Sequence, residues 1–373
     1  MKQNIDKGSV MQKKILTKTH FNDLIQLLIN QGYDVVGPQV KDDAIVYDNL
    51  DDSEQFPIGV HDDQTPGSYS LLKTDEPSWF AWANGPQALK PMVFSPQEKL
   101  WSAIKDEQNK LKFVENISQP SPIAVIGVRA CDLSALAIQD KHFLESDFRD
   151  PYYESRRENL LLIAINCSHP AQSCFCVAAD SGPEVKSGYD LALTELRDGF
   201  LISAGTVRGD ELLQQLTLEK ATEEDLSVAK QQADHAREVQ TRVIPEIKSL
   251  KNLVNQIEHS HWDEIAKRCL SCGNCTAVCP TCFCHSEKDT PELDGSQSDH
   301  VRLWDSCFNQ QHSYIHGIVI RSETKTRYRQ WLTHKFSTWF TQYGQSGCVG
   351  CGRCISWCPV GIDVTEELAV ICE

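Results

Sequence analysis

Two cysteine runs near the C-terminal end constrain this 373-residue chain more than any other feature. The first run, over residues 269–280, reads C-L-S-C-G-N-C-T-A-V-C-P, and the second, over residues 348–359, reads C-V-G-C-G-R-C-I-S-W-C-P. In both, two residues separate each of the first three cysteines, three residues precede the fourth, and a proline comes last. We expect the C-terminal part of the chain to fold around whatever these eight thiols bind.

The spacing is typical of bacterial proteins that hold two [4Fe–4S] clusters. Three thiolates spaced by two residues can wrap one backbone turn around three iron corners of a cubane, whereas the fourth cannot comfortably close the same cube. The fourth cysteine of each run therefore ligates the other cluster, and the proline after it ends the local helix. The predicted ligand sets are Cys269, Cys272, Cys275 and Cys358 for one cluster, and Cys348, Cys351, Cys354 and Cys279 for the other.

Composition narrows the class of protein. Sixteen cysteines would suggest disulfides in a small secreted chain, but here they cluster at metal-ligand spacing in a long chain without a recognisable signal peptide. The longest apolar runs, such as residues 160–165, are too short to span a bilayer. A net charge of −16 argues against nucleic acid as the main partner. We therefore expect a cytoplasmic protein with neither a membrane nor a nucleic-acid partner.

The length favours two domains, and the pattern before the cysteine runs predicts an N-terminal α/β domain. Continuous apolar runs at residues 123–128 and 160–165 fit buried strands. A helix capped by Asp132 and running to about Phe143 lies between them, with a short helix at Pro151. Strand, helix and strand in this order predict a parallel crossover.

Other elements complete this domain. The sequence predicts a helix over residues 19–32 with Thr19 as its cap, short strands near residues 34–36 and 44–47, and a hairpin over residues 191–203. Residues 51–97 are rich in Asp, Pro and Gly and are predicted to form surface loops. Their aromatic side chains are interpreted as anchors for these loops, namely Trp79, Phe80 and Trp82.

We predict an α+β protein in four parts. Residues 1–18 form a tail, residues 19–218 the α/β domain, residues 219–258 a helical connection, and residues 259–373 an α-helical ferredoxin domain with both clusters. The connection opens with a capping box at Thr222 and Asp225. After Pro245, a second helix presents one apolar face, made of Ile247, Leu250, Val254 and Ile257.

The long insert between the cysteine runs carries an aromatic stripe at helical spacing. The stripe consists of Tyr328, Trp331, Leu332, Phe336, Trp339, Phe340 and Tyr343. Core packing that shields the clusters is its first interpretation, and a docking surface is the second. The same segment is basic, through Arg321, Lys325, Arg327, Arg329 and Lys335. These cations form a solvated face, offset the anionic clusters, or meet an acidic partner.

Four further cysteines lie in the N-terminal domain, namely Cys131, Cys167, Cys174 and Cys176. Cys131 and Cys167 each follow a predicted parallel strand, so both emerge at the carboxyl edge of the sheet, where α/β folds place ligands. Cys131 also starts a helix, whose dipole stabilises a thiolate or an anionic cluster. A third [4Fe–4S] cluster, buried reduced thiols and zinc remain open, and His169 is interpreted as a loop residue.

Three more cysteines follow the first run in C-P-T-C-F-C and W-D-S-C, namely Cys282, Cys284 and Cys307. Three thiols hold a cluster only with another ligand, so this possible metal site is incomplete, and ligands drawn from both domains are conceivable. Cys372 is interpreted as a tail residue.

Taken together, these segments resemble one family of iron–sulfur electron-transfer subunits. The family comprises the beta subunit of cytosolic sulfhydrogenases, which are bidirectional NiFe hydrogenases, and the iron–sulfur subunit of anaerobic sulfite reductases. The similarity covers most of the chain from about Thr19. It rests on G-V-R-A-C-D-L, N-C followed by S-C-F-C, H-W-D-E-I-A-K-R-C-L-S-C-G-N-C, C-P-T-C-F-C, W-D-S-C, R-Y-R-Q-W-L-T-H-K-F and C-V-G-C-G-R-C. The C-terminal part is also similar to the α-helical ferredoxin domain of fumarate reductases.

The resemblance implies a subunit that is not itself catalytic. Such a subunit relays electrons between a flavin-containing subunit, which oxidises or reduces NAD(P)H, and a separate catalytic subunit. The hydrogenase branch is preferred over the sulfite reductase branch because of P-V-G-I-D after Cys358 and the R-Y-R-Q-W-L-T-H-K-F helix. Neither an Arg-x-Cys-x-x-Cys pair of a NiFe subunit nor a G-x-G-x-x-G after a strand is present. An enzyme with an N-terminal catalytic cluster and a zinc-stabilised interaction module are the rival hypotheses.

One charge inside the second run also has an expected effect. Arg353 stands where the first run has Asn274, and a nearby cation favours the more reduced state of a cluster. We therefore expect the cluster bound by Cys348, Cys351 and Cys354 to have the higher reduction potential of the two.

Overall fold

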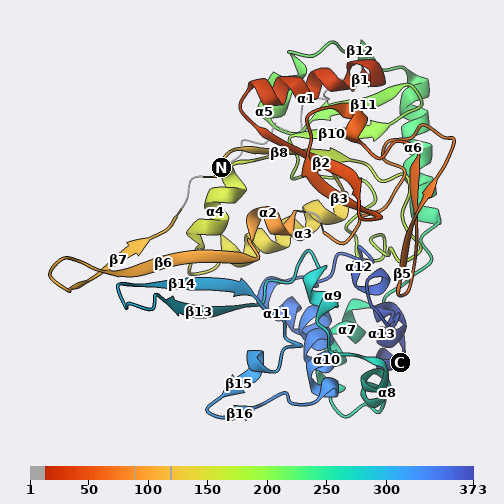
Figure 1. The fold of residues 1–373 in the computed structure, drawn as a ribbon. Coiled ribbons are helices and arrows are strands. Elements are labelled where there is room, and N and C mark those ends of the chain that lie inside the picture. The colour runs from red at the N-terminus through yellow and green to blue at the C-terminus, as the bar shows by residue number, and fades with distance from the viewer. Residues whose placement is uncertain (1–12, 88, 118–119) are drawn as a thin grey trace.

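The structure, a computed structural model, describes residues 13–87, 89–117 and 120–373 (Figure 1). Its N-terminal part is built on an eight-stranded mixed sheet in the order β12-β1-β11-β10-β9-β8-β2-β3. The strands are β1 (Lys14–Thr17), β2 (Asp34–Lys41), β3 (Ala44–Asn49), β8 (Ile123–Val128), β9 (Leu160–Ile165), β10 (Leu191–Glu195), β11 (Gly199–Ala204) and β12 (Glu219–Lys220).

Four neighbouring strands of this sheet, β2, β8, β9 and β10, run parallel. Such strands are buried on both faces, and their side chains alternate accordingly. Ala124 and Ile126 of β8 pack in one core cluster with α1 (Phe21–Asn30) and α5 (Val207–Leu213). Val125, from the other face of β8, packs with the helices α2 (Lys90–Val93), α3 (Ala130–Phe143) and α4 (Pro151–Glu158). The predicted parallel crossover is therefore confirmed.

The N-terminal boundary of the domain was misplaced. The predicted tail, residues 1–18, includes Lys14–Thr17, which form β1 and pair with β11 and β12. Residues 1–12 lie outside the described residues. The first helix is confirmed, but His20 rather than Thr19 precedes it, and no side chain caps it. Asp132 likewise does not cap α3, which begins after Arg129.

Residues 51–97 are not only surface loops, as predicted. They contain the antiparallel hairpin of β4 (Val60–Thr65) and β5 (Ser68–Lys73), and the backbone N–H of Gly67 at its tip donates to the carbonyl of Ile355. Phe80 and Trp82 are completely buried, and Trp79 is 8% exposed. Their role as anchors is confirmed, but they anchor this segment within the main core rather than over its surface.

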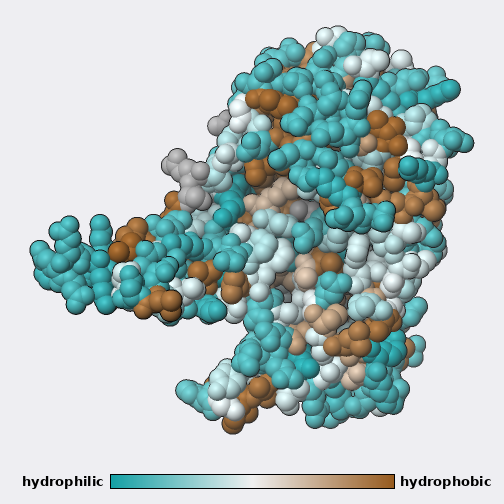
Figure 2. Space-filling model, viewed as in Figure 1, coloured by the Kyte–Doolittle hydropathy of each residue, from teal (hydrophilic) through white to brown (hydrophobic). Residues whose placement is uncertain are grey.

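A second sheet connects segments that the domain division separates. Strands β6 (Gln97–Lys105) and β7 (Leu111–Glu115) pair with β14 (Gln297–Trp304) and β13 (His285–Pro291) in the antiparallel order β13-β14-β6-β7. These strands form an arm (Figure 1), whose surface is mostly hydrophilic in Figure 2. Near its base, Arg302 is buried and bonds to Glu98 at 3.0 Å. The insert between the cysteine runs is thus partly a hairpin, which the helical pattern did not predict.

The C-terminal part is helical apart from this hairpin and the short pair β15 (Tyr314–Ile315) and β16 (Ile318–Val319). Its helices are α8 (His261–Arg268), α9 (Asn274–Ala277), α10 (Thr324–Thr333), α11 (Trp339–Tyr343), α12 (Arg353–Ser356) and α13 (Val364–Cys372). A π-helical turn, His334–Thr338, joins α10 to α11. Across the described ranges, no helix combines the length and the apolar character that crossing a membrane requires.

The connection holds α6 (Glu223–Glu238), which opens with the predicted capping box at Thr222 and Asp225, and α7 (Ile247–Asn252). The predicted apolar face of the second helix is wrong, because only Leu250 of its four residues is buried. Ile247, Val254 and Ile257 are exposed. The helix ends at Asn252, so the later positions never share a face with its start.

Candidate iron–sulfur sites

The two cysteine runs adopt the same local geometry. In each, a glycine with positive φ precedes a one-turn helix, Gly273 (+75°) before α9 and Gly352 (+74°) before α12. The left-handed conformation favours glycine, which explains the C-G-N-C and C-G-R-C sequences. Helices α9 and α12 pack against each other. The runs therefore lie face to face, as an exchange of their fourth cysteines requires.

The first predicted ligand set lines one cavity. Its walls include Cys269, Cys272, Cys275 and Cys358. Phe308, Tyr328 and Trp331 of the aromatic core close the same cavity. Two backbone N–H groups point at sulfur, from Ser271 to Cys269 and from Ile362 to Cys358, both at 3.4 Å. This set thus has the dry wall and the sulfur-directed donors that suit a cubane.

The second set is grouped in the same way. Burial raises the pKa of Cys354, and thiolates at Cys348, Cys351 and Cys279 raise it further, which places these four thiols together. Burial also raises the pKa of Cys348 to about 12, against the effect of Lys335. The N–H of Gly350 donates to Cys348 sulfur at 3.3 Å. Cys279 comes from the first run, as the exchange predicts.

Lys335 is a candidate functional residue whose role the sequence left open. Its side chain is 5% exposed, and its ammonium donates to Cys279 sulfur at 3.4 Å, to the Thr281 hydroxyl at 2.8 Å and to the Gly347 carbonyl at 3.1 Å. Burial opposes its charge, but thiolates at Cys279, Cys282 and Cys348 hold the pKa of Lys335 well above its usual range. Lys335 follows Trp331 by four residues and so falls on the buried face of the helix. This spacing is the sequence signal that could have distinguished it from the solvated basic residues of the same segment.

Arg353 is buried but does not act as an isolated cation. Its guanidinium donates to the Asp132 carboxylate at 2.9 Å, and both side chains are 1% exposed. Asn84 donates to the same carboxylate at 2.9 Å. The carboxylate compensates much of the positive charge of Arg353. A higher reduction potential of the second cluster would therefore depend on Lys335 rather than on Arg353.

The four N-terminal cysteines converge beside the second run. Burial raises the pKa of Cys174, and thiolates at Cys176, Cys167 and Cys351 raise it further. Cys131 has the same neighbours in Cys351 and Cys176. Burial also raises the pKa of Cys176 to about 12. The carboxyl edge of the sheet therefore brings these thiols together, next to the second ligand set.

Backbone contact between the two loops fixes this proximity. The N–H of Phe175 donates to the Gly350 carbonyl at 2.8 Å, and the hydroxyls of Ser173 and Ser356 lie 2.7 Å apart. A Cβ on Gly350 would lie 2.4 Å from the Phe175 carbonyl oxygen, and a Cβ on Gly352 would lie 2.6 Å from the Ser173 carbonyl oxygen. The glycines between the cysteines therefore serve the approach of the N-terminal loop as well as the turn itself.

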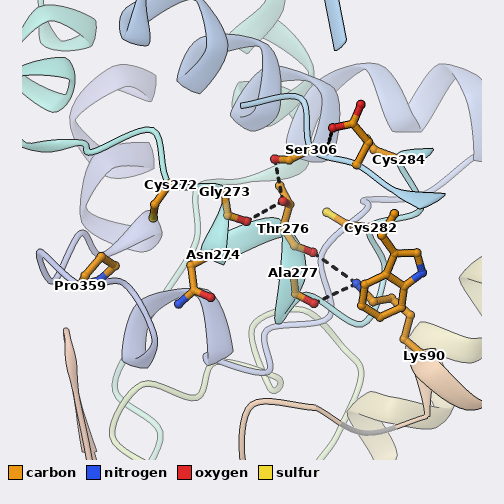
Figure 3. Close-up of a pocket in the computed structure, with 12 residues that line it drawn as sticks. Lys90, Cys272, Gly273, Asn274, Thr276, Ala277, Cys282, Cys284, Ser306 and Pro359 are labelled. Carbon is orange, nitrogen blue, oxygen red and sulfur yellow. Dashed lines mark hydrogen bonds between the residues drawn. The ribbon is translucent and has the colours of Figure 1, made fainter. Parts of the chain in front are cut away.

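Two of the remaining cysteines border a cavity of about 580 Å³ (Figure 3). Cys282 and Cys284 line it together with Cys272 of the first run and Lys90. Cys307 and His312 are hydrogen-bonded to the Cys284 side chain, and these bonds lower the pKa of Cys284 to about 4. His169 lies in a loop, as interpreted, with its ring 4.9 Å from that of His61. Cys372 is not a tail residue, because it ends α13 and packs against the C-terminal core.

All sixteen cysteines are free thiols. Among the described residues, no three or more His, Cys, Asp or Glu side chains stand in an arrangement for a single metal ion. The two ligand sets of the runs instead combine apolar walls, sulfur-directed N–H donors and, for the second set, a buried cation. These features fit [4Fe–4S] clusters.

Comparison with known proteins agrees with this geometry. Residues 268–362 match the family model of the 4Fe-4S dicluster domain. The Sulfhydrogenase 2 subunit beta of Pyrococcus furiosus is 31% identical over 288 residues, which are 75% of this chain and 81% of the relative. This chain belongs to the same family. The resemblance drawn from the cysteine segments to iron–sulfur electron-transfer subunits is thereby confirmed, and no solved structure matches the chain.

We expect Gly352→Ala to destabilise this beta-subunit relative more than Gly344→Ala. Both glycines have φ near +73°, which costs an alanine about 1–2 kcal/mol. A Cβ at Gly344 meets nothing within 4 Å, whereas at Gly352 it meets the Ser173 backbone. Thermal unfolding of both variants measures the difference, and equal midpoints would show that the loops do not need this close contact.

Proposed function

We propose that this chain is the iron–sulfur relay of a cytosolic NiFe sulfhydrogenase, with a flavin-containing NAD(P)H subunit on one side and the hydrogenase subunit on the other. The observation that carries the proposal is a continuous row of thiol groups. Cys275 of the first set neighbours Cys354 of the second, and Cys351 of the second neighbours Cys131 and Cys174 of the N-terminal group. A row of this kind leads from one part of the protein to the other.

The proposed ligands keep the predicted sets. Cys269, Cys272, Cys275 and Cys358 hold one cluster, and Cys348, Cys351, Cys354 and Cys279 hold the second. Cys131, Cys167, Cys174 and Cys176 hold a third. Residues 259–373 then form the α-helical ferredoxin part. Bound cubanes supply one-electron carriers, whose potentials depend on hydrogen bonds to sulfur, local charge and solvent access.

The chain's own residues control those three factors. Trp331 and Phe336 exclude water, since they are 5% and 0% exposed in the core beside the runs. Backbone N–H groups hold the sulfurs of Cys269, Cys348 and Cys358. Lys335 provides a fixed positive charge. The burial of Trp331 and Phe336 thus supports the interpretation that the aromatic stripe packs in the core and shields the clusters.

The partner class is inferred from the relative, whose name is that of a sulfhydrogenase subunit. The sequence carries neither the cysteine pairs of a NiFe subunit nor a dinucleotide-binding glycine motif. Hydrogen activation and NAD(P)H oxidation therefore belong to separate chains in this proposal, and a sulfite-reducing partner is the alternative that the following test separates.

A tagged chain purified anaerobically from its own organism should retain two partners, a flavin subunit together with a hydrogenase subunit. In that complex, Cys351→Ala should abolish hydrogen-dependent NAD(P)⁺ reduction but preserve hydrogen-dependent reduction of a small dye at the catalytic subunit, because only the relay is interrupted. Co-purification of a sulfite-reducing chain instead would replace the hydrogenase assignment. Equal loss of both activities would show that Cys351 is needed for assembly rather than for relay.

Iron and acid-labile sulfide analysis tests the N-terminal cluster. Cys131→Ala and Cys176→Ala should each lose about four irons per chain relative to the wild type. Cys372→Ala is the matched control, because Cys372 packs at the end of α13 and should leave the iron content unchanged. If both N-terminal variants keep the wild-type iron content, these cysteines are structural and the row ends at the second cluster.

Lys335→Met should lower the reduction potential of the second cluster by about 60 mV, the equivalent of about 1.4 kcal/mol for one electron. The variant removes a buried cation that donates to Cys279 sulfur. Lys325→Met is the control, since Lys325 is partly exposed and pairs with Asp263. Redox titration followed by electron paramagnetic resonance measures both, and an unchanged potential in Lys335→Met would exclude this electrostatic role.

A further inference from the structure

Three cysteines near the first run, Cys282, Cys284 and Cys307, have no place in the proposed relay, and the arm explains why two of them, Cys284 and Cys307, come together. Cys284 immediately precedes β13, and β14 ends at Trp304, which pairs with His285. The ladder continues in a bond from the Asp305 N–H to the Cys284 carbonyl at 2.9 Å. The hairpin therefore returns the chain to its starting point and places Cys307 beside Cys284, although 22 residues lie between them in the sequence.

A fourth side chain of ligand type joins these thiols. His312 is hydrogen-bonded to the Cys284 side chain, and its Nδ1 lies 3.1 Å from Asp305 Oδ2. The other carboxylate oxygen of Asp305 accepts from the Ser306 N–H at 2.7 Å and from Asn309 at 3.0 Å. A carboxylate that fixes one imidazole nitrogen and frees the other for a metal is the usual outer support of a ligating histidine.

An unpaired buried cation provides an independent indication of an anionic group here. Lys90 is 6% exposed and lies over the Trp304 ring at 3.9 Å. Its ammonium donates to the carbonyls of Ala277 at 2.9 Å and Thr276 at 3.3 Å (Figure 3). Over the described part of the chain, no carboxylate forms an ion pair with it. Burying a charge without a counter-charge is expensive, and Lys90 lines the same cavity as Cys282 and Cys284.

We propose that Cys282, Cys284, Cys307 and His312 hold a further [4Fe–4S] cluster beside this cavity, which Cys282 and Cys284 line, with Lys90 compensating its negative charge. The proposal extends the relay proposed above and rests on it for the direction of electron flow, but not for the ligands. Cys272 of the first set lines the same cavity and is exposed, so the cluster lies at the outer end of the row. Neutral histidine in place of a thiolate raises a cluster's potential, as in Rieske centres, which suits a terminal electron acceptor.

Iron and sulfide analysis of the full-length chain, prepared anaerobically, tests the site. Cys284→Ser and His312→Ala should each lose about four irons per chain, whereas His312→Cys should retain them by completing a four-cysteine set. His316→Ala is the matched control, because His316 is exposed in the neighbouring β15–β16 turn and should leave the iron content unchanged. Cys351→Ala, measured beside them, reports on the proposed relay separately.

Pulsed electron paramagnetic resonance of chain labelled with ¹⁵N-histidine decides the ligand even where a variant fails to fold. A reduced cluster in the wild type and in His316→Ala should show a directly coordinated nitrogen, and His312→Cys should lose that coupling while keeping its iron. The proposal is overturned if the wild type shows no such nitrogen coupling, if Cys284→Ser and His312→Ala keep the wild-type iron and sulfide, or if the lost metal is zinc without sulfide. Those outcomes leave the relay intact as long as Cys351→Ala still loses iron.

Discussion

A direct contact between two backbone segments, with no side chain between them, fixes the N-terminal cysteines beside the second cysteine run. The loop with Cys174 and Cys176 lies against the turn of the second run, and the two touch through carbonyl oxygens and glycine α-carbons. Because a Cβ on Gly350 or Gly352 would clash with the opposite backbone, glycine at these positions allows the N-terminal thiols to lie next to the second set. The β4–β5 hairpin adds a further contact, through Gly67 and the end of the same run.

Burying so many thiols in one region sets an electrostatic problem, and the chain solves it with cations that arrive from distant segments. Lys335 comes from the π-helical turn, Lys90 from α2, and Arg353 from the second run itself. Of these three cations, Arg353 alone pairs with a carboxylate of the described residues, that of Asp132. The two lysines instead bond to carbonyls, a hydroxyl and sulfur, which leaves their positive charge available to anionic groups nearby.

Local patterns predicted the parts of the fold that depend on local chemistry. The cysteine spacing and its glycines are a property of one turn, and the runs at residues 123–128 and 160–165 are apolar throughout, so both were predictable. The pairing of β6 with β14 was not, because nothing in either strand specifies a partner almost 200 residues away. Ile247, Val254 and Ile257 were misassigned because periodicity does not show where a helix stops.

The residues of the candidate site were likewise predictable where a local sequence pattern marks them, and not where only contacts between distant segments bring them together. The eight cysteines of the two runs carry their own signature, whereas Lys90, Asn84 and His312 have no motif and are recognised only from their surroundings. Lys335 is intermediate, since its position on the aromatic stripe is visible in the sequence but its contact with Cys279 is not.

The arm has a consequence for the rate at which electrons would cross the proposed relay. Tunnelling between carriers falls steeply with distance, so a loose joint between two cofactor-bearing parts would make the rate fluctuate as the parts move. Here β14, which lies between the cysteine runs in the sequence, is hydrogen-bonded along its length to β6. In the sequence, β6 falls between β3 and β8 of the N-terminal sheet. A hinge motion would have to break that ladder. Strands from both parts of the chain share the four-stranded sheet, so the distances between the proposed carriers, and with them the electronic coupling, would be set when the protein folds.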